Sequence, residues 1–400
     1  MRPTSAAAPA LPGAFVTSAS LLGDTFLYTV LPVSAARLGM APLLVGVVLS
    51  INRWVRLLTN PLAGRLYARL PAGALLAVAL PLAAVSTALY AEPTWVVVLL
   101  AGRLLWGLCF SLLRLGSYLA AVDDTSERAG RRLGEIRGVF GVGYLAGALY
   151  APFALEAFGW RVACLVAAGL TFVGGIVPAA LVARWRRGVS FVEEGTGRAS
   201  VWEPRLALLF VIGAAQLWVA AGIIPVAGGI RIAELFPTGG AIAGLSVVPT
   251  FIAAAFVLTQ RVAQVVWQPF AGRLADRALD VTFAVSTVIA VASVLVLLFP
   301  IDATMFVLAG LVTNFAGLLG AIGVELAVAR RSTSADRPRV LAAFHTWQDG
   351  GAAVGALAGG ALVGAFGTIS AIAAGEALVV LSFPLWWLAR RAHVAAAVAA

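Results

Sequence analysis

The sequence predicts an all-α membrane protein, with twelve transmembrane helices in two pseudo-symmetric six-helix bundles. Three observations lead to this fold class. The 400-residue chain is 61% hydrophobic and 12% charged, and its mean hydropathy of +0.98 excludes a soluble globular chain of this size. Apolar stretches of about 20 residues, the length that a helix needs to cross ~30 Å of hydrocarbon, recur along the chain. The second half also repeats motifs of the first at a constant spacing.

Charged loops and Pro/Gly positions divide the apolar sequence into segments. The first is expected to be an uncleaved span and not a signal peptide, because its apolar run continues past Asp24. The twelve expected spans are residues 14–37, 43–63, 72–91, 94–121, 133–157, 160–183, 205–229, 241–270, 280–300, 302–329, 339–364 and 367–389.

The distribution of charge predicts the orientation of the chain. Its net charge is +10, and all 28 of its basic residues are Arg, with no Lys. Most of these Arg lie in short loops, and the basic residues do not form one stripe, so nucleic acid is not an expected partner. If the N-terminus is cytoplasmic, the outer loops contain only Arg37, Arg161 and Arg231. The positive-inside rule therefore predicts cytoplasmic N- and C-termini, and we expect a multi-pass protein of a bacterial inner membrane.

An internal repeat predicts the domain organisation. The string "NPLAGRLYAR" at 60–69 recurs as "QPFAGRLADR" at 268–277, and "AFG" at 157–159 recurs at 365–367, both at a spacing of 208 residues. A polar stretch separates the two copies. We expect an N-terminal half at 1–183, a cytoplasmic linker at 184–204 and a C-terminal half at 205–400.

Parallel six-helix repeats are a common frame of secondary transporters, and several motifs resemble those of the major facilitator superfamily. "GRLADR" at 272–277 resembles its loop signature, "RLLWG" at 103–107 its fourth-helix motif, and "GVGYLAG" at 141–147 a Gly-rich motif of its fifth helix. "DTFLYTVLP" at 24–32 is similar to the first helix of drug–proton antiporters. The resemblance implies two bundles that rock about a central site.

The repeated loop motif comprises Gly64 and Arg65 in the first copy and Gly272, Arg273, Asp276 and Arg277 in the second. We expect Gly272 to permit a tight cytoplasmic turn. Asp276 is expected to face the N-terminal end of the fifth helix and so to stabilise the outward-facing state. The first copy has Ala68 in the acidic position, so we expect the first half to rely on buried charges instead.

Charged and polar side chains within spans are costly and are therefore candidates for function. Asp24 has no basic neighbour in its own helix and is the leading proton site, although it also suits a cap before the kink at Pro32. Arg103 is a candidate for proton linkage, although it also suits a purely structural pair with Asp24. The expected proton-coupling and substrate cavity comprises Asp24, Tyr28, Arg103, Trp106, Phe110, Gln216 and Asn314.

A second set of polar residues lies towards the cytoplasmic ends of the spans. His345 and Asp349 lie one turn apart at about the depth of Arg53 and Arg56, and Glu325 at about that of Arg114. We expect a cytoplasmic gate across the two halves, formed by Arg53, Arg56, Arg114, Glu325, His345 and Asp349. Two potential ligands on one helix do not make a metal site.

The combined features predict proton-coupled export of a small organic or amphiphilic compound by alternating access. Uptake or exchange of an anionic metabolite stays open because Arg outnumbers acids in the spans, and so does lipid flipping. HExxH, GxSxG and the phosphate-cradling GxxxxGK[ST] are absent, so no enzyme is expected. The expected partners are a small molecule, protons and the lipid bilayer, with no cofactor and no metal, and the expected state is a monomer.

Overall fold

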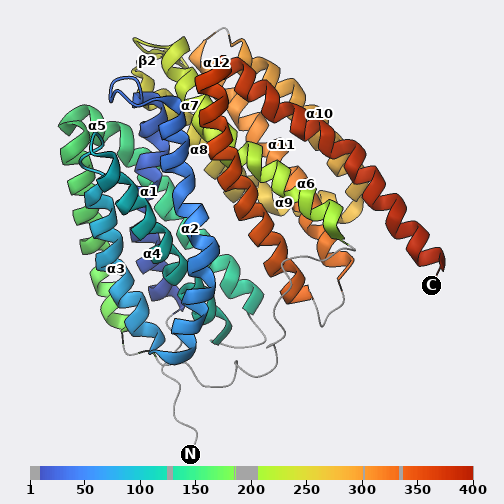
Figure 1. The fold of residues 1–400 in the computed structure, drawn as a ribbon, viewed down its shortest axis with the longest axis horizontal. Coiled ribbons are helices and arrows are strands. Elements are labelled where there is room, and N and C mark those ends of the chain that lie inside the picture. The colour runs from blue at the N-terminus through green and yellow to red at the C-terminus, as the bar shows by residue number, and fades with distance from the viewer. Residues whose placement is uncertain are drawn as a thin grey trace, which may run out of the picture. The chain divides into compact units, whose positions relative to one another are not determined.

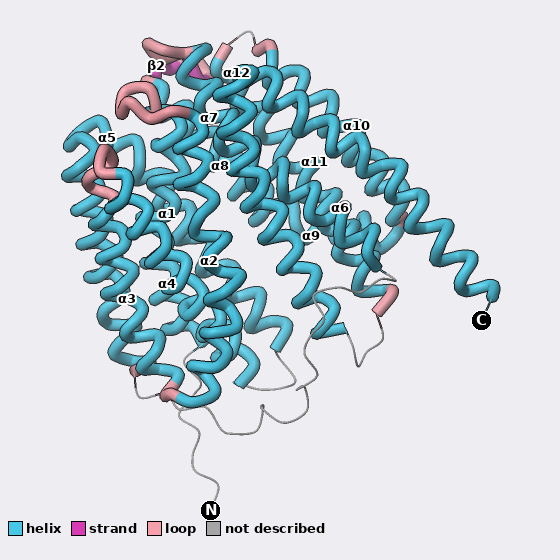
Figure 2. Tube along the Cα trace, in the orientation of Figure 1, coloured by secondary structure: helices cyan, strands magenta, loops and turns pink. Residues whose placement is uncertain are grey.

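The computed structural model describes residues 10–123, 129–183, 185, 206–300, 302–332 and 337–399. The expected linker at 184–204 thus lies outside the described residues, apart from Trp185. The described chain is helical except for short turns and one β-hairpin (Figures 1 and 2). Nine of its helical segments are long and apolar enough to cross a bilayer.

The chain divides into two compact units. The first comprises Met1–Val30 and Ile51–Thr196, and the second Leu31–Ser50 and Gly197–Ala400. The first part of the chain forms α1 (Ala10–Ser34), α2 (Pro42–Arg69), α3 (Ala72–Leu89), α4 (Val96–Asp123) and α5 (Ala129–Val182). The end of α1 and the start of α2 therefore group with the second unit. A division of the chain at the linker alone would place them in the first unit.

The second part of the chain contains two helices with π-helical segments. These segments, η3 and η4, contain five residues each and follow α6 and α8 without a break. The elements are α6 (Ala207–Trp218), η3 (Val219–Ile223), α7 (Ile224–Leu235), β1 (Gly240–Ile242), β2 (Leu245–Val247), α8 (Pro249–Val262), η4 (Ala263–Trp267), α9 (Gln268–Arg277), α10 (Leu279–Leu298), α11 (Ala303–Arg330) and α12 (Arg337–Ala399).

The two longest helices are each interrupted at one glycine. α5 has 54 residues and a non-helical Gly159, with φ 73° and ψ 172°. α12 has 63 residues and a non-helical Gly367, with φ 82° and ψ 170°. Both conformations lie in the positive-φ region that glycine adopts without strain. The two glycines are 208 residues apart, so the sequence repeat is also a repeat of backbone conformation.

Close helix contacts in the two units follow the same repeat. In the first unit, a Cβ on Gly143 of α5 would overlap Ser18 O of α1, and one on Gly147 would lie 2.9 Å from Leu22 O. In the second, Gly351 and Gly355 of α12 face Ala214 O and Trp218 O of α6 in the same way. We call these two contacts the glycine seams. They bring backbone against backbone, as small residues do between membrane helices.

Two expectations about local structure are wrong. The eighth span does not begin at residue 241, because β1 and β2 form a hairpin and α8 begins at Pro249. Ala243 and Gly244 form the two-residue turn, with φ 50° and 83°, as a type I′ hairpin requires. Gly272 does not make a tight turn, because it lies within α9, as Gly64 lies within α2. The chain turns after Arg277, at Ala278 (φ −149°, ψ 68°).

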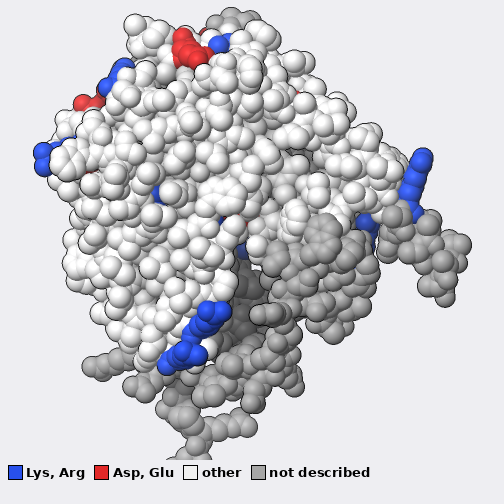
Figure 3. All heavy atoms as spheres, in the orientation of Figure 1, with Lys and Arg blue, Asp and Glu red and all other residues white. Residues whose placement is uncertain are grey.

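The surface agrees with a membrane environment. The face in Figure 3 has few charged side chains among a large uncharged area. Large apolar side chains are exposed along α5, among them Phe153, Val173 and Leu181. Such continuous apolar exposure is unfavourable in water and favourable against lipid.

The glycine seam of the first unit yields a stability prediction. Gly143→Ala is expected to lower the free energy of unfolding by roughly 1–3 kcal/mol, because the new Cβ forces α1 and α5 apart. Gly138→Ala, on the same helix with nothing near its Cβ position, is the matched control and should be neutral or stabilising. Thermal unfolding in detergent measures both. Equal melting temperatures for the two variants would contradict the seam.

Candidate functional site

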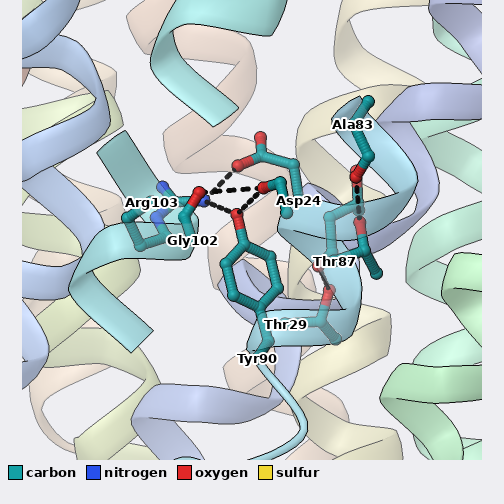
Figure 4. Close-up of polar contacts among 9 residues, drawn as sticks. Asp24, Thr29, Ala83, Thr87, Tyr90, Gly102 and Arg103 are labelled. Carbon is teal, nitrogen blue, oxygen red and sulfur yellow. Dashed lines mark hydrogen bonds and ion pairs between the residues drawn. The ribbon is translucent and has the colours of Figure 1, made fainter. Parts of the chain in front are cut away.

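A buried ion pair joins α1 and α4. Arg103 is 0% exposed, and its Nη1 donates to Asp24 Oδ1 at 2.5 Å. The same Nη1 lies 3.4 Å from the hydroxyl of Tyr90, which follows α3 (Figure 4). Asp24 and Arg103 are both candidates from the sequence, and the structure brings them together.

Small residues next to the ion pair make the three-helix contact possible. A Cβ on Gly102 would lie 2.9 Å from Tyr90 Cε1 and 3.0 Å from Ser86 O, so only glycine lets α4 approach α3 here. Ser86 Oγ donates to Gly102 O at 2.9 Å. The Tyr90 hydroxyl, 3.1 Å from Ser86 Oγ, can therefore donate to Ser86 while it accepts from Arg103. Tyr90 was missed because it lies at the end of its apolar span, beside a loop.

Further arginines lie over aromatic rings in the same unit. The guanidinium carbons of Arg53 and Arg103 are 5.5 Å and 5.3 Å from the centroid of Tyr28. Those of Arg56 and Arg114 are 5.1 Å and 5.4 Å from the centroid of Phe110. We call these residues the arginine–aromatic cluster: Arg53, Arg56, Arg103, Arg114, Tyr28 and Phe110.

The arginine–aromatic cluster is partly buried and strongly positive. Arg56 and Phe110 are 7% and 8% exposed, and the Trp106 ring packs on Phe110 at 5.5 Å. Four guanidinium groups and the carboxylate of Asp24 together have a formal charge of +3. Aromatic faces attract cations and so lower the cost of that charge. A planar organic anion would find both bidentate donors and stacking surfaces here.

The other two expected cavity residues, Gln216 and Asn314, lie in the second unit. They line a common pocket with a cavity volume of about 40 Å³. Asn314 Nδ2 donates to Thr259 Oγ1 at 2.9 Å. Each of the two units thus contains polar groups of its own.

The expected gate residues are distributed over both units. In the second unit, His345 of α12 lies 3.4 Å from Glu325 of α11, a pair not expected from the sequence. Asp349 follows His345 by one turn of α12. The three arginines of the gate lie in the first unit, so the cross-half gate and the Arg114–Glu325 pair stay predictions.

The loop-motif residues lie in α9 and in the last turns of α2, and their charged side chains are exposed. Asp276 Oδ1 is 3.1 Å from Arg330 Nη2, both side chains being about half exposed or more. The guanidinium of Arg273 lies 5.7 Å from the centroid of Phe270. An exposed ion pair of this kind contributes little to stability. The expected contact of Asp276 with the fifth helix stays a prediction.

A neighbouring polar contact was missed from the sequence. Asp280, in the first turn of α10, accepts from Arg390 at 2.5 Å and from Trp386 Nε1 at 3.0 Å. Both partners come from the last part of α12, more than a hundred residues away. No local pattern in the sequence indicates a contact over such a separation.

Sequence and structure comparisons define the class of protein. The model of the Major Facilitator Superfamily matches residues 13–262. No curated protein sequence matches the chain. A mutant of the nucleoside transporter NupG has the same fold, with a TM-score of 0.79 at 12% identity over 95% of this chain and 99% of that one.

Two further solved structures are similar over nearly their whole lengths. A bacterial homologue of the human lysosomal transporter Spinster, inward-facing and unoccupied, gives a TM-score of 0.76 at 12% identity, covering 96% of each chain. A mutant of the peptide transporter POT gives 0.70 at 16% identity, covering 95% of this chain and 94% of that one.

The family match and the apolar helices of the described residues define a multi-pass membrane transporter, not an enzyme. The chain belongs to the Major Facilitator Superfamily, because the family's match covers more than half of it.

The buried ion pair predicts strong energetic coupling between Asp24 and Arg103. Asp24→Asn leaves a buried guanidinium without its carboxylate, and Arg103→Gln leaves a buried carboxylate, so each is expected to cost roughly 3–5 kcal/mol. The double variant has neither charge and should lose clearly less than the sum. Thermal unfolding of the four proteins in detergent measures this coupling, and additive losses would refute it.

Proposed function

We propose that the protein is a proton-coupled secondary transporter that exports a small organic or amphiphilic compound by alternating access. We further propose twelve crossings of a bacterial inner membrane, cytoplasmic termini and a monomeric state. Antiport is favoured by the similarity of residues 24–32 to the first helix of drug–proton antiporters.

The interrupted helices support twelve crossings. A crossing takes about 20 residues, and α5 and α12 have 54 and 63, with a break at Gly159 and at Gly367. Each is therefore long enough for two crossings joined at its glycine. α6, η3 and α7 follow one another as a single crossing, and so do α8, η4 and α9.

The single observation that supports proton coupling is the contact of Asp24 with the fully buried Arg103. Protonation of Asp24 removes the negative charge that stabilises the guanidinium in a low-dielectric setting. Arg103 then needs another acceptor, and Tyr90 and the ring of Tyr28 are already within its reach. A protonated and an unprotonated transporter would therefore differ in how firmly α1 is held to α4, which is the two-state element that coupling requires.

Transport measurements test this proposal. Compounds that raise the melting temperature of the purified protein are selected, and their movement is followed in proteoliposomes with an imposed pH gradient. We expect movement that stops when an ionophore collapses the gradient, and that is lost in Asp24→Asn. The Asp24→Asn/Arg103→Gln variant controls for loss of folding, because it also lacks Asp24 but has no unpaired buried charge from this pair. Movement that survives the ionophore would exclude proton coupling.

A second candidate function is transport of an organic anion, including uptake or exchange. The arginine–aromatic cluster favours it, because the cluster combines four guanidinium groups with the faces of Tyr28 and Phe110. The positive charge of the cluster predicts a negatively charged ligand. It does not determine the direction of transport.

The cluster predicts selective binding of aromatic anions. Naphthalene-2-sulfonate is expected to raise the melting temperature of the purified protein, and Arg56→Gln or Arg114→Gln should weaken this effect by about tenfold or more, since each removes one charge near Phe110. Arg69→Gln, at the exposed end of α2, is the matched control. Equal loss in all three variants would indicate unspecific charge attraction.

A further inference from the structure

The second unit contains an acidic pocket that neither the ion pair nor the arginine–aromatic cluster involves. It lies among α6, η3, α7, α10, α11 and α12, with a cavity volume of about 40 Å³. Glu376 of α12 lines it and is its sole ionisable residue among those described. Glu376 is also an intramembrane acid for which the sequence indicates no partner.

Two acceptor oxygens in this pocket need a donor. Glu376 and Gln216 are both 9% exposed. Within the described part of the chain, neither Glu376 Oε1 nor Gln216 Oε1 has a hydrogen-bond partner. A buried oxygen left without a donor costs roughly 1–3 kcal/mol, and more if it is charged. The cost falls when a bound group donates to both oxygens.

The three hydroxyl groups of the pocket direct their protons elsewhere. Ser286 and Thr287 donate to Phe283 O, at 2.7 Å and 3.1 Å. Thr313 donates to Ala309 O at 2.8 Å. These hydroxyls therefore present lone pairs to the pocket. Their oxygens, together with Glu376 and Gln216, suit a ligand that donates hydrogen bonds and has a positive charge.

Backbone features leave room for the pocket and for the side chain of Gln216. A Cβ on Gly320 would lie 2.8 Å from Gln216 Nε2 and 3.1 Å from Ser286 Oγ, so a larger residue there would displace both. The π-helical η3 begins at Val219, three residues after Gln216, and contributes Val219 and Ala220 to the wall. π-helical segments are frequent at functional sites.

The pocket residues of the second unit can be compared with the residues at the equivalent positions of the first unit. The glycine seams pair Ser18 with Ala214 and Leu22 with Trp218, a constant spacing of 196 residues between α1 and the α6–η3 helix. At that spacing the position of Asp24 corresponds to Ala220, which lines the pocket. At the spacing of 208, Glu376 corresponds to Ala168. The acid of the second unit, Glu376, thus lies on α12 and not on the α6–η3 helix that corresponds to α1. The described lining of the pocket contains no arginine to pair with it.

We propose that this pocket binds the ammonium group of a small organic amine, with Glu376 and Gln216 accepting its N–H bonds. Apolar side chains of Val219, Ile224 and Val379 form other parts of the wall and suit the alkyl portion of such a ligand. A few placed polar groups on a mainly apolar wall are typical of small-molecule sites. The site lies wholly within the second unit and does not depend on the proposed direction or proton coupling of transport.

Ligand stabilisation of the purified full-length protein tests the proposal. Melting temperature is measured in neutral detergent at constant ionic strength with ethylammonium chloride, tetramethylammonium chloride or sodium chloride. Ethylammonium should stabilise the protein saturably, whereas tetramethylammonium, which has the charge but no N–H, should not. Glu376→Gln is expected to weaken the effect by at least about tenfold. Glu156→Gln, an exposed acid of α5, is the matched control and should retain it.

A second measurement avoids dependence on a variant that fails to fold. Ethylammonium should slow the labelling of Glu376 by a hydrophobic carbodiimide in the wild-type protein, as read by mass spectrometry of the α12 peptide. Equal stabilisation by sodium would overturn the ammonium assignment in favour of an inorganic cation. Stabilisation that persists in Glu376→Gln, or labelling that ethylammonium does not slow, would overturn the site itself.

Discussion

The burial of the Arg103 guanidinium is the constraint on which the first unit depends. A charged side chain at the centre of a bilayer helix costs roughly 2.5–3.5 kcal/mol on insertion scales, so it persists where neighbours offset that cost. Asp24 supplies the opposite charge, and Tyr90 a hydroxyl. α1, α3 and α4 must therefore approach closely at one depth, and Gly102 makes this approach possible.

Much of the fold follows from the sequence because its signals are local. Apolar length predicts the helices, and the "AFG" repeat marks the breaks that Gly159 and Gly367 make in α5 and α12. The hairpin at 240–247 was missed because its residues are apolar and adjoin a span, so hydropathy alone joins them to the helix. Gly272 was misplaced because glycine permits a turn without requiring one.

The site is less predictable because its residues come together from distant helices. Asp24 and Arg103 are each visible as charges in apolar runs, and only the fold shows that they touch. Tyr90 has no local signal, since a tyrosine at a helix end is common at a membrane interface. Glu376 stands out in the sequence as an acid in an apolar run, but its relation to Gln216 depends on the packing of α12 against α6 and η3.

The glycine seams also bear on how two copies of one unit diverge. The closest contacts at Gly143 and Gly351 are to backbone oxygens of the facing helix, and Ser18 Oγ also lies 2.7 Å from the Cβ position at Gly143. Contacts to the backbone place few demands on the side chains of the facing helix. The seam face of α1 has Ser18 where that of α6 has Ala214, and both are accommodated. Substitutions on these helices can thus alter the chemistry of each interior without changing the spacing of the helices, so two units with one backbone pattern can present different side chains.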